Sequence, residues 1–206
     1  MVERQLRRRG IDDPCVLRAM ARVPREEFLP EDERRAAYRD AAVGIGEGQT
    51  MSQPWIVACM TQLLELRGNE RVLEVGTGSG YGAAILAMCA AEVVTIERHE
   101  SLAEQARSTL DRLGFDNVEV RVGDGSKGAP DRAPFGGISV TAAAAGEPPA
   151  ELVEQLAPGA AIVCPVRRGG EEMLVRMRDG REAAVVPVRF VPLVESPDAP
   201  QDEPRA

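Results

Sequence analysis

A glycine-rich turn between two apolar segments is the part of this chain best suited to binding a ligand. Residues 71–75 read as a buried strand, and Gly76, Gly78 and Gly80 follow it directly. Glycines leave no side chain between backbone and ligand, and the helix expected after the turn directs its N-terminal amides at any anion there. A second apolar strand closes at Glu97, where a carboxylate can accept both hydroxyls of a ribose. The pattern predicts a site for a nucleoside-bearing cofactor.

The spacing of the glycines favours S-adenosylmethionine over a dinucleotide. A dinucleotide fingerprint read from Gly76 needs glycine where Tyr81 stands, and read from Gly78 it is completed only by Ala83, a weaker variant. E-x-G-x-G-x-G, beginning at Glu74, is the form typical of methyltransferases. Glu97 has an alternative reading as a solvated strand end.

A third candidate ligand contact follows the next expected strand. Asp124 lies between Gly123 and Gly125, at a position where its carboxylate could accept the amino group of adenine. An Asx turn between the two glycines is the alternative, because aspartate side chains bond readily to nearby backbone amides. Glycines, ribose acid and adenine acid after three successive strands form a more specific pattern than the glycines alone.

Composition argues against several other classes of protein. The chain has 206 residues, a size for one domain, and its net charge of -8 disfavours nucleic acid or an anionic membrane as partner. It has one histidine and four scattered cysteines without a CxxC pair, which argues against a metal site. We expect no signal peptide, because the charged residues at 3–9 are followed by no apolar segment, and no membrane span, because no apolar stretch is long enough. We therefore expect no metal and a cytoplasmic location.

Strands and helices alternate through the middle of the chain, which predicts a parallel sheet covered on both faces. Asp13-Pro14 marks an earlier helix start, and a glycine-rich loop is expected over 38–50. Strands are predicted at 71–75, 92–97, 117–121, 137–141 and 160–165, helices at 53–66 (with Gly68 as its stop), 80–90, 99–113 and 148–156, and a hairpin from 173–177 and 183–190.

These elements define an α/β fold, a Rossmann-like class I methyltransferase with a mostly parallel, doubly wound sheet, an N-terminal helical extension and a C-terminal hairpin. We divide the chain into an N-terminal helical and substrate-loop region, residues 1–50, and an S-adenosylmethionine-binding domain, residues 51–195. The polar, proline-rich tail, residues 196–206, is predicted to be disordered.

Beyond these motifs, nearly the whole chain resembles the protein-L-isoaspartate (D-aspartate) O-methyltransferase family. Residues 45–54, Ile-Gly-Glu-Gly-Gln-Thr-Met-Ser-Gln-Pro, are the most specific part, because other methyltransferases have no reason to share them. The remaining matches are Val23-Pro24-Arg25 with Phe28, Tyr38-Arg39-Asp40, residues 72–81, Gly123-Asp124-Gly125, Pro134-Phe135, Val140-Thr141-Ala142-Ala143 and Phe190-Val191-Pro192-Leu193.

The resemblance implies methylation of the free α-carboxylate of L-isoaspartyl and D-aspartyl residues in damaged proteins, with S-adenosylhomocysteine as by-product and repair through a succinimide. It implies isoaspartyl proteins as partners and a monomeric enzyme. Ser52 would orient the substrate carboxylate, although it could instead cap the following helix. The implied cofactor residues are Gly76, Thr77, Gly78, Ser79, Gly80, Glu97, Arg98, Gly123, Asp124, Gly125, Thr50 and Gln53, and the implied substrate residues are Ile45, Gly46, Gly48, Val191, Pro192 and Leu193.

Four sites depart from the family pattern, one of them Glu26, where histidine is frequent. Gly136 stands where an aspartate is usual, Ala41-Ala42 replace a proline-leucine pair, and Trp55 replaces a tyrosine and could stack near the nucleoside or belong to the core. The departures leave open a related methyltransferase that modifies one particular aspartate of a partner or precursor peptide. A protein that keeps the cofactor fold without catalysis is a further alternative.

Overall fold

The computed structural model describes residues 1–194, and the predicted tail at 196–206 lies outside them. Its main sheet has the strand order β10-β9-β8-β6-β3-β4-β5, with β7 paired to β8. The pairs β3–β4, β4–β5, β3–β6 and β6–β8 are parallel, whereas β8–β9 and β9–β10 are antiparallel. The order reverses beside β3, the switch point where open α/β sheets bind ligands. The predicted fold class and C-terminal hairpin are confirmed.

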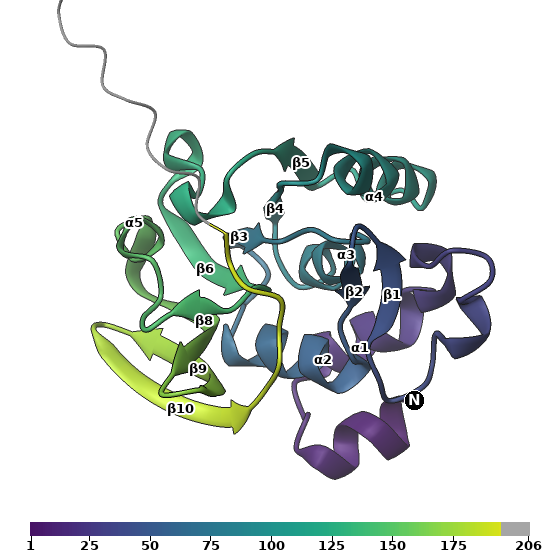
Figure 1. Ribbon diagram of the computed structural model, residues 1–206, viewed down its shortest axis with the longest axis horizontal. Helices are drawn as coiled ribbons and strands as arrows, with labels where there is room; N and C mark the ends of the chain where they lie inside the picture. Colours follow the sequence, from purple (N-terminus) through teal and green to yellow (C-terminus); the bar gives the residue numbers. More distant parts are fainter. Residues whose placement is uncertain (195–206) are drawn as a thin grey trace, which may run out of the picture.

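The described elements agree closely with the predicted segments in the middle of the chain (Figure 1). The α-helices are α1 (Pro14–Arg22), α2 (Pro54–Leu63), α3 (Tyr81–Ala87), α4 (Glu100–Arg112) and α5 (Ala150–Val153). The strands are β1 (Val43–Gly46), β2 (Gln49–Met51), β3 (Arg71–Val75), β4 (Glu92–Glu97), β5 (Val118–Val122), β6 (Phe135–Val140), β7 (Ala144–Ala145), β8 (Leu156–Arg168), β9 (Glu171–Arg178) and β10 (Arg181–Pro187).

Two apolar clusters bury the two faces of the central strands. Val72 and Val93 belong to the cluster that includes α2, α3 and α4, whereas Leu73 and Val94 belong to the cluster beneath α5. Alternate residues of one strand enter opposite clusters because side chains alternate across a sheet. This double burial explains why β3 and β4 read as continuous apolar runs.

The N-terminal region packs into the first of these clusters. Asp13 caps α1 by accepting hydrogen bonds from the backbone amides of Cys15 and Val16, as its position before proline predicts. The buried face of α1 contacts α2 and α3. Helical turns at Val2–Leu6, Arg7–Arg9, Arg25–Phe28 and Arg34–Ala36 complete this region.

Four local predictions need correction. The expected glycine-rich loop contains an antiparallel hairpin, β1–β2, in a separate sheet. Helix α2 ends at Leu63, and Glu65 takes the left-handed conformation with φ of 55°, so Gly68 is not its stop. Helix α5 is a single turn. Gln53, not Ser52, is the N-cap residue of α2, and its side chain makes no cap hydrogen bond.

Candidate active site

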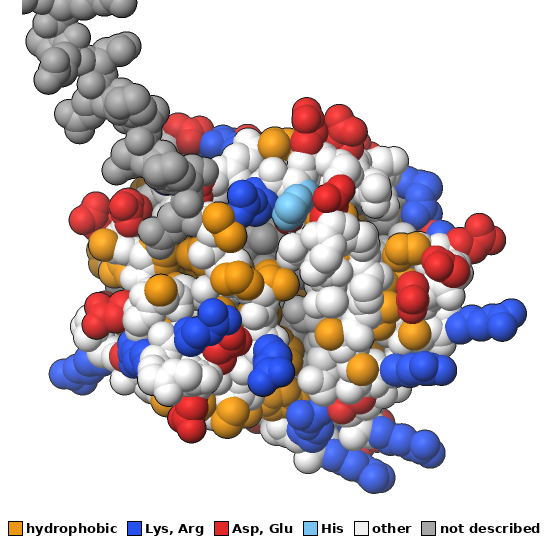
Figure 2. All heavy atoms as spheres, in the orientation of Figure 1, with side chains coloured by type: hydrophobic (Ala, Val, Ile, Leu, Met, Phe, Trp, Pro, Cys, Tyr) orange, Lys and Arg blue, Asp and Glu red, His pale blue; other side chains and the backbone are white. Residues whose placement is uncertain are grey.

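A cavity of about 1090 Å³ lies at the carboxyl ends of β3 and β4. Its wall comes mainly from four segments far apart in sequence: the β2–α2 junction, the turn after β3, the end of β4, and residues 187–194. In Figure 1 the last of these segments runs from the end of β10 back across the strand ends towards β3. Figure 2 shows the corresponding hollow, and His99 is among the residues that line the cavity. The volume lies at about the upper limit of ordinary small-ligand sites.

The glycine turn forms the floor of the cavity. Gly76, Gly78 and Gly80 have φ of 91°, 51° and 88°, in the left-handed region that favours glycine. A Cβ atom on Gly76 would lie 2.3 Å from Oγ1 of Thr141. Gly80 is the N-cap residue of α3, so the first amides of that helix lie beside the turn. The backbone therefore forms a turn packed against Thr141, which we call the glycine cradle.

Glu97 lies at the end of β4 and lines the cavity. It is only 5% exposed, which contradicts the reading of a solvated strand end. Its two carboxylate oxygens accept hydrogen bonds from the backbone amides of Gly78 and His99, at 2.8 and 3.0 Å. These bonds fix the carboxylate against the glycine turn and leave lone pairs for further donors, which suits a ribose diol.

Glu74 is a buried cavity residue whose environment the sequence did not reveal. Its Oε2 accepts a hydrogen bond of 2.7 Å from the Thr95 hydroxyl, which lies 2.6 Å from the Thr77 hydroxyl. Burial raises the pKa of Glu74 to about 8, an effect that the Thr95 hydrogen bond reduces and the negative charge of Glu97 reinforces. The side chain is therefore largely protonated at neutral pH in the unliganded protein.

This raised pKa predicts a stability that falls with pH. Between the ordinary glutamate pKa of about 4.3 and the folded value, the unfolded chain ionises while the folded protein keeps its proton. Folded stability should then fall by at most about 1.4 kcal/mol per pH unit, until the loss levels off above about pH 8. Glu74→Gln removes this contribution, so its stability advantage over the wild type should grow from pH 5 to pH 8. Urea unfolding without cofactor measures it, and a pH-independent difference contradicts the assignment.

Ser52 stands at the junction between β2 and α2, on the cavity wall. Its carbonyl oxygen accepts a hydrogen bond of 2.6 Å from Nη2 of Arg25. The neighbouring Gln53 donates from Nε2 to the carboxylate of Asp40 at 2.7 Å, and Asp40 is also paired with Arg9 at 2.8 Å. The Ser52 carbonyl and the Gln53 side chain are therefore both held by residues from the N-terminal region.

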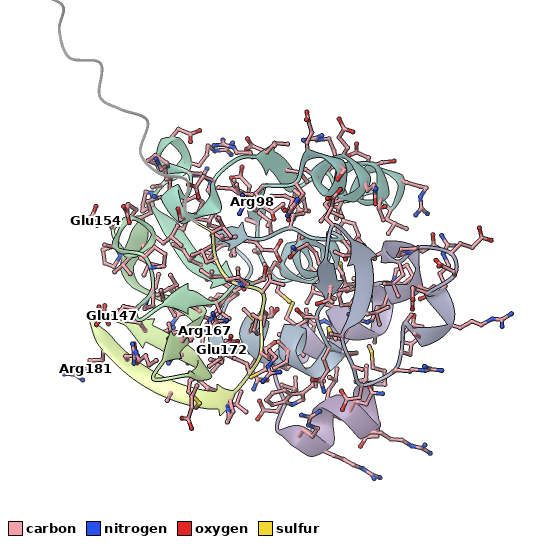
Figure 3. The ribbon with its side chains drawn as sticks, in the orientation of Figure 1. Arg98, Glu147, Glu154, Arg167, Glu172 and Arg181 are labelled. Atoms are coloured by element: carbon pink, nitrogen blue, oxygen red, sulfur yellow. The ribbon has the colours of Figure 1, made fainter. Side chains whose placement is uncertain are left out.

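Residues 188–193 form the opposite wall. The amide of Ala143 donates to the carbonyl of Val191, and the amide of Leu193 donates to the carbonyl of Ala143, both at 2.8 Å. Glu172 of β9 accepts a hydrogen bond of 2.8 Å from the backbone amide of Phe190 and forms an ion pair with Arg167 of β8. Figure 3 shows Arg167 and Glu172 together at this segment, with Arg98 farther along the sheet edge. The segment is held extended along the cavity.

The structure brings most of the predicted site residues together. Ile45 is instead buried, with its Cδ1 atom 3.2 Å from a Cβ built on Gly78, so it supports the glycine turn from behind. Asp124 forms the Asx turn, accepting from the amide and hydroxyl of Ser126. The predicted residues on the cavity wall are Gly48, Thr50, Ser52, Gln53, Gly76, Thr77, Gly78, Ser79, Glu97, Arg98, Gly125, Val191, Pro192 and Leu193; those not on it are Ile45, Gly46, Gly80, Gly123 and Asp124.

Sequence reasoning missed several other wall residues. Met51, Ile56 and Val57 flank Ser52, and Arg189 and Phe190 extend the opposite segment. The apolar spacing of α2 could have indicated Ile56 and Val57 only as core. Arg189 and Phe190 line the cavity only because the chain after β10 folds back to the ends of β3 and β4, and no local sequence pattern indicates this.

Two departures from the family pattern have structural explanations. A Cβ on Gly136 would lie 2.6 Å from Cγ of Glu70, and Gly136 is at the start of β6, remote from the strand ends that form the cavity. Trp55 does not line the cavity: its indole donates to the carbonyl of Arg9, whose guanidinium lies 4.4 Å from the ring centroid. The prediction that Trp55 could stack on a nucleoside is therefore wrong. Of the departures, Ala42 alone is on the cavity wall.

The glycine cradle follows β3 and Glu97 ends β4, beside the point where the strand order of the sheet reverses. This arrangement is that of a Rossmann-like methyltransferase. Residues 1–198 match the model of the Protein-L-isoaspartate(D-aspartate) O-methyltransferase (PCMT) family. The chain belongs to this family. It is 54% identical over 202 residues to Protein-L-isoaspartate O-methyltransferase 2 of Marinobacter nauticus, covering 94% of this chain and 91% of that one.

Two solved structures share the fold over most of this chain. One, a protein-L-isoaspartate O-methyltransferase, has a TM-score of 0.82 and 28% identity, and the match covers 93% of this chain but 65% of that longer one. The second, from Plasmodium falciparum, has a TM-score of 0.80 and 26% identity, covering 92% and 95%. It is a putative protein-L-isoaspartate O-methyltransferase in complex with S-adenosyl-L-homocysteine.

Among the described residues, no three His, Cys, Asp or Glu side chains are grouped as a metal site would need. In the part of the chain that the structure describes, no helix is both long enough and apolar enough to cross a membrane.

Proposed function

We propose that this protein transfers a methyl group from S-adenosylmethionine to the free α-carboxylate of L-isoaspartyl and D-aspartyl residues in damaged proteins. The observation that supports this most directly is the cavity itself. It joins a glycine cradle and Glu97, which suit a nucleoside cofactor, to the Ser52 junction and the extended 188–193 segment, which suit a peptide.

The residues present fit this cofactor. The turn at Gly76 and Gly78 keeps its shape because no Cβ is there to meet Thr141 or Ile45. The fixed carboxylate of Glu97 suits the two ribose hydroxyls. Asp124 is engaged by Ser126, and a further bond from its carboxylate to adenine is part of the proposal. When bound, S-adenosylmethionine supplies an electrophilic methyl group on a sulfonium.

The protein's own contribution is positioning. The substrate carboxylate is ionised at neutral pH, so no general base is needed to expose it. The Ser52 hydroxyl donates a hydrogen bond to one carboxylate oxygen and thereby directs the other at the methyl group, an effect of orientation. Residues 191–193 contact the peptide through backbone, which accommodates many sequences around one lesion. The backbone nitrogen of the residue that follows the lesion then attacks the methyl ester and displaces methanol, which gives the succinimide without help from the protein.

A paired-peptide assay tests the proposal. An isoaspartyl peptide and S-adenosylmethionine should release S-adenosylhomocysteine, and the matching aspartyl peptide should release almost none. No turnover with several isoaspartyl peptides overturns the proposal. Preferred methylation of the aspartyl peptide supports the alternative acceptor, a particular aspartate of a partner, for which Ala42 on the cavity wall is the structural motive.

The proposal includes a monomeric enzyme in the cytoplasm that uses no metal. Light scattering of the purified chain at assay concentration measures the first point. If the enzyme uses no metal, its activity should be unchanged after dialysis against a chelator.

A further inference from the structure

Arg25 is a fully buried arginine that takes no part in the proposed chemistry directly. It is 0% exposed, and none of the described carboxylates is paired with it as a salt bridge. An unpaired charge inside a protein lowers stability unless hydrogen bonds compensate for it. Burial lowers the pKa of Arg25, which reflects this cost. The contacts of the side chain indicate what offsets it.

The guanidinium joins three segments that meet behind the cavity wall. Nε donates to the carbonyl of Ala37 at 2.7 Å, and Nη2 donates to the carbonyl of Ser52 at 2.6 Å. Its Cζ atom lies 4.6 Å from the ring centroid of Tyr81, a cation–π contact. Tyr81 is the first residue of α3, directly after the glycine turn. Arg25 therefore links the Ser52 junction to the cofactor cradle.

We infer that Arg25 is a positioning residue, which fixes the Ser52 backbone so that the hydroxyl faces the reacting carboxylate. This inference rests on the proposed function. Ser52 is not the N-cap residue of α2, and the hydrogen bond from Arg25 to its carbonyl holds the peptide unit between Ser52 and Gln53. Only a planar guanidinium with several donors can bond two carbonyls on different segments while stacking on a ring.

Arg25→Lys is the informative variant, because lysine keeps the charge but cannot donate to the carbonyls of Ala37 and Ser52 with the planar geometry of a guanidinium. A displacement of reacting groups by about 1 Å can reduce rate about 100-fold. We expect kcat for an isoaspartyl peptide to fall about tenfold to a hundredfold. The Kd for S-adenosylmethionine, measured by calorimetry, should change less than about threefold, since the glycine turn and Glu97 keep their own hydrogen bonds.

A double-variant cycle separates positioning from general structure. If Arg25 acts through Ser52, adding Arg25→Lys to Ser52→Ala should lower kcat little further. Phe28→Leu is the matched control, because Phe28 is buried against the same Tyr81 ring, 5.5 Å between centroids, and has no hydrogen bond to Ser52. It should lower the melting temperature and leave kcat within about twofold.

The outcomes are distinct. Additive losses in the double variant, or an equal loss in Phe28→Leu, overturn the inference and make Arg25 a structural residue. Failure of both Arg25→Lys and Arg25→Gln to fold leads to the same conclusion. A wild-type protein inactive on every isoaspartyl peptide instead overturns the proposed function, whereas an active wild type with unaffected Arg25 variants overturns this inference alone.

Discussion

Replacing Ser52 with alanine should lower kcat/KM for an isoaspartyl peptide by about 10- to 100-fold. The substitution removes one hydrogen bond to a charged group, and such bonds contribute roughly 1.5–3 kcal/mol. The Ser52 carbonyl keeps its bond to Arg25, so the surrounding backbone should not move. Initial rates at saturating S-adenosylmethionine measure the effect.

The loss should be confined to the acceptor side of the reaction. The Kd for S-adenosylmethionine should be nearly unchanged, and Ser52→Thr, which retains a hydroxyl, should recover part of the activity. Ser108→Ala removes the same hydroxyl group from the exposed face of α4 and is the control. Equal weakening of cofactor binding and peptide turnover in Ser52→Ala would show that the serine acts on the loop as a whole.

Strands buried on both faces were the easiest part of the fold to predict. Residues 71–75 and 92–97 match β3 and β4 at both ends, because a parallel strand between two helical layers must be apolar throughout. The hairpin turn was equally visible, since Asp179 and Gly180 both have positive φ and their residue types suit such a turn. These features depend on local sequence.

Features that depend on strand register or on returning segments were not predictable in this way. Glu74 and Thr95 bond because the register of β3 and β4 places them opposite each other, and a single sequence does not reveal register. The β1–β2 hairpin was read as a loop because its pairing is short and includes two glycines. Arg25 appeared only as part of a matching motif, and its bond to Ser52 spans 27 positions.

Replacing Gly76 with alanine should weaken S-adenosylmethionine binding about 100-fold or more. Alanine at φ of 91° is strained, and its Cβ would lie 2.3 Å from Oγ1 of Thr141. Thr141 cannot retreat freely, because this hydroxyl donates to the carbonyl of Gly76 at 2.8 Å. The turn itself must move. Because the backbone amide of Gly76 donates a hydrogen bond to the carbonyl of Ile96, that movement also disturbs the end of β4. Calorimetry with S-adenosylmethionine and S-adenosylhomocysteine should show the same loss for both ligands.

Two further variants divide the effect of Gly76→Ala into its causes. Thr141→Ala removes the colliding oxygen, so the double variant should regain part of the affinity while the backbone strain persists. Gly114→Ala introduces comparable strain, at φ of 78°, where a Cβ meets nothing within 4 Å. It should lower stability by about 1 kcal/mol and leave the Kd unchanged. If Gly76→Ala binds cofactor as tightly as Gly114→Ala does, the cradle is not where the nucleoside cofactor binds, because no ligand held against this turn could tolerate its displacement.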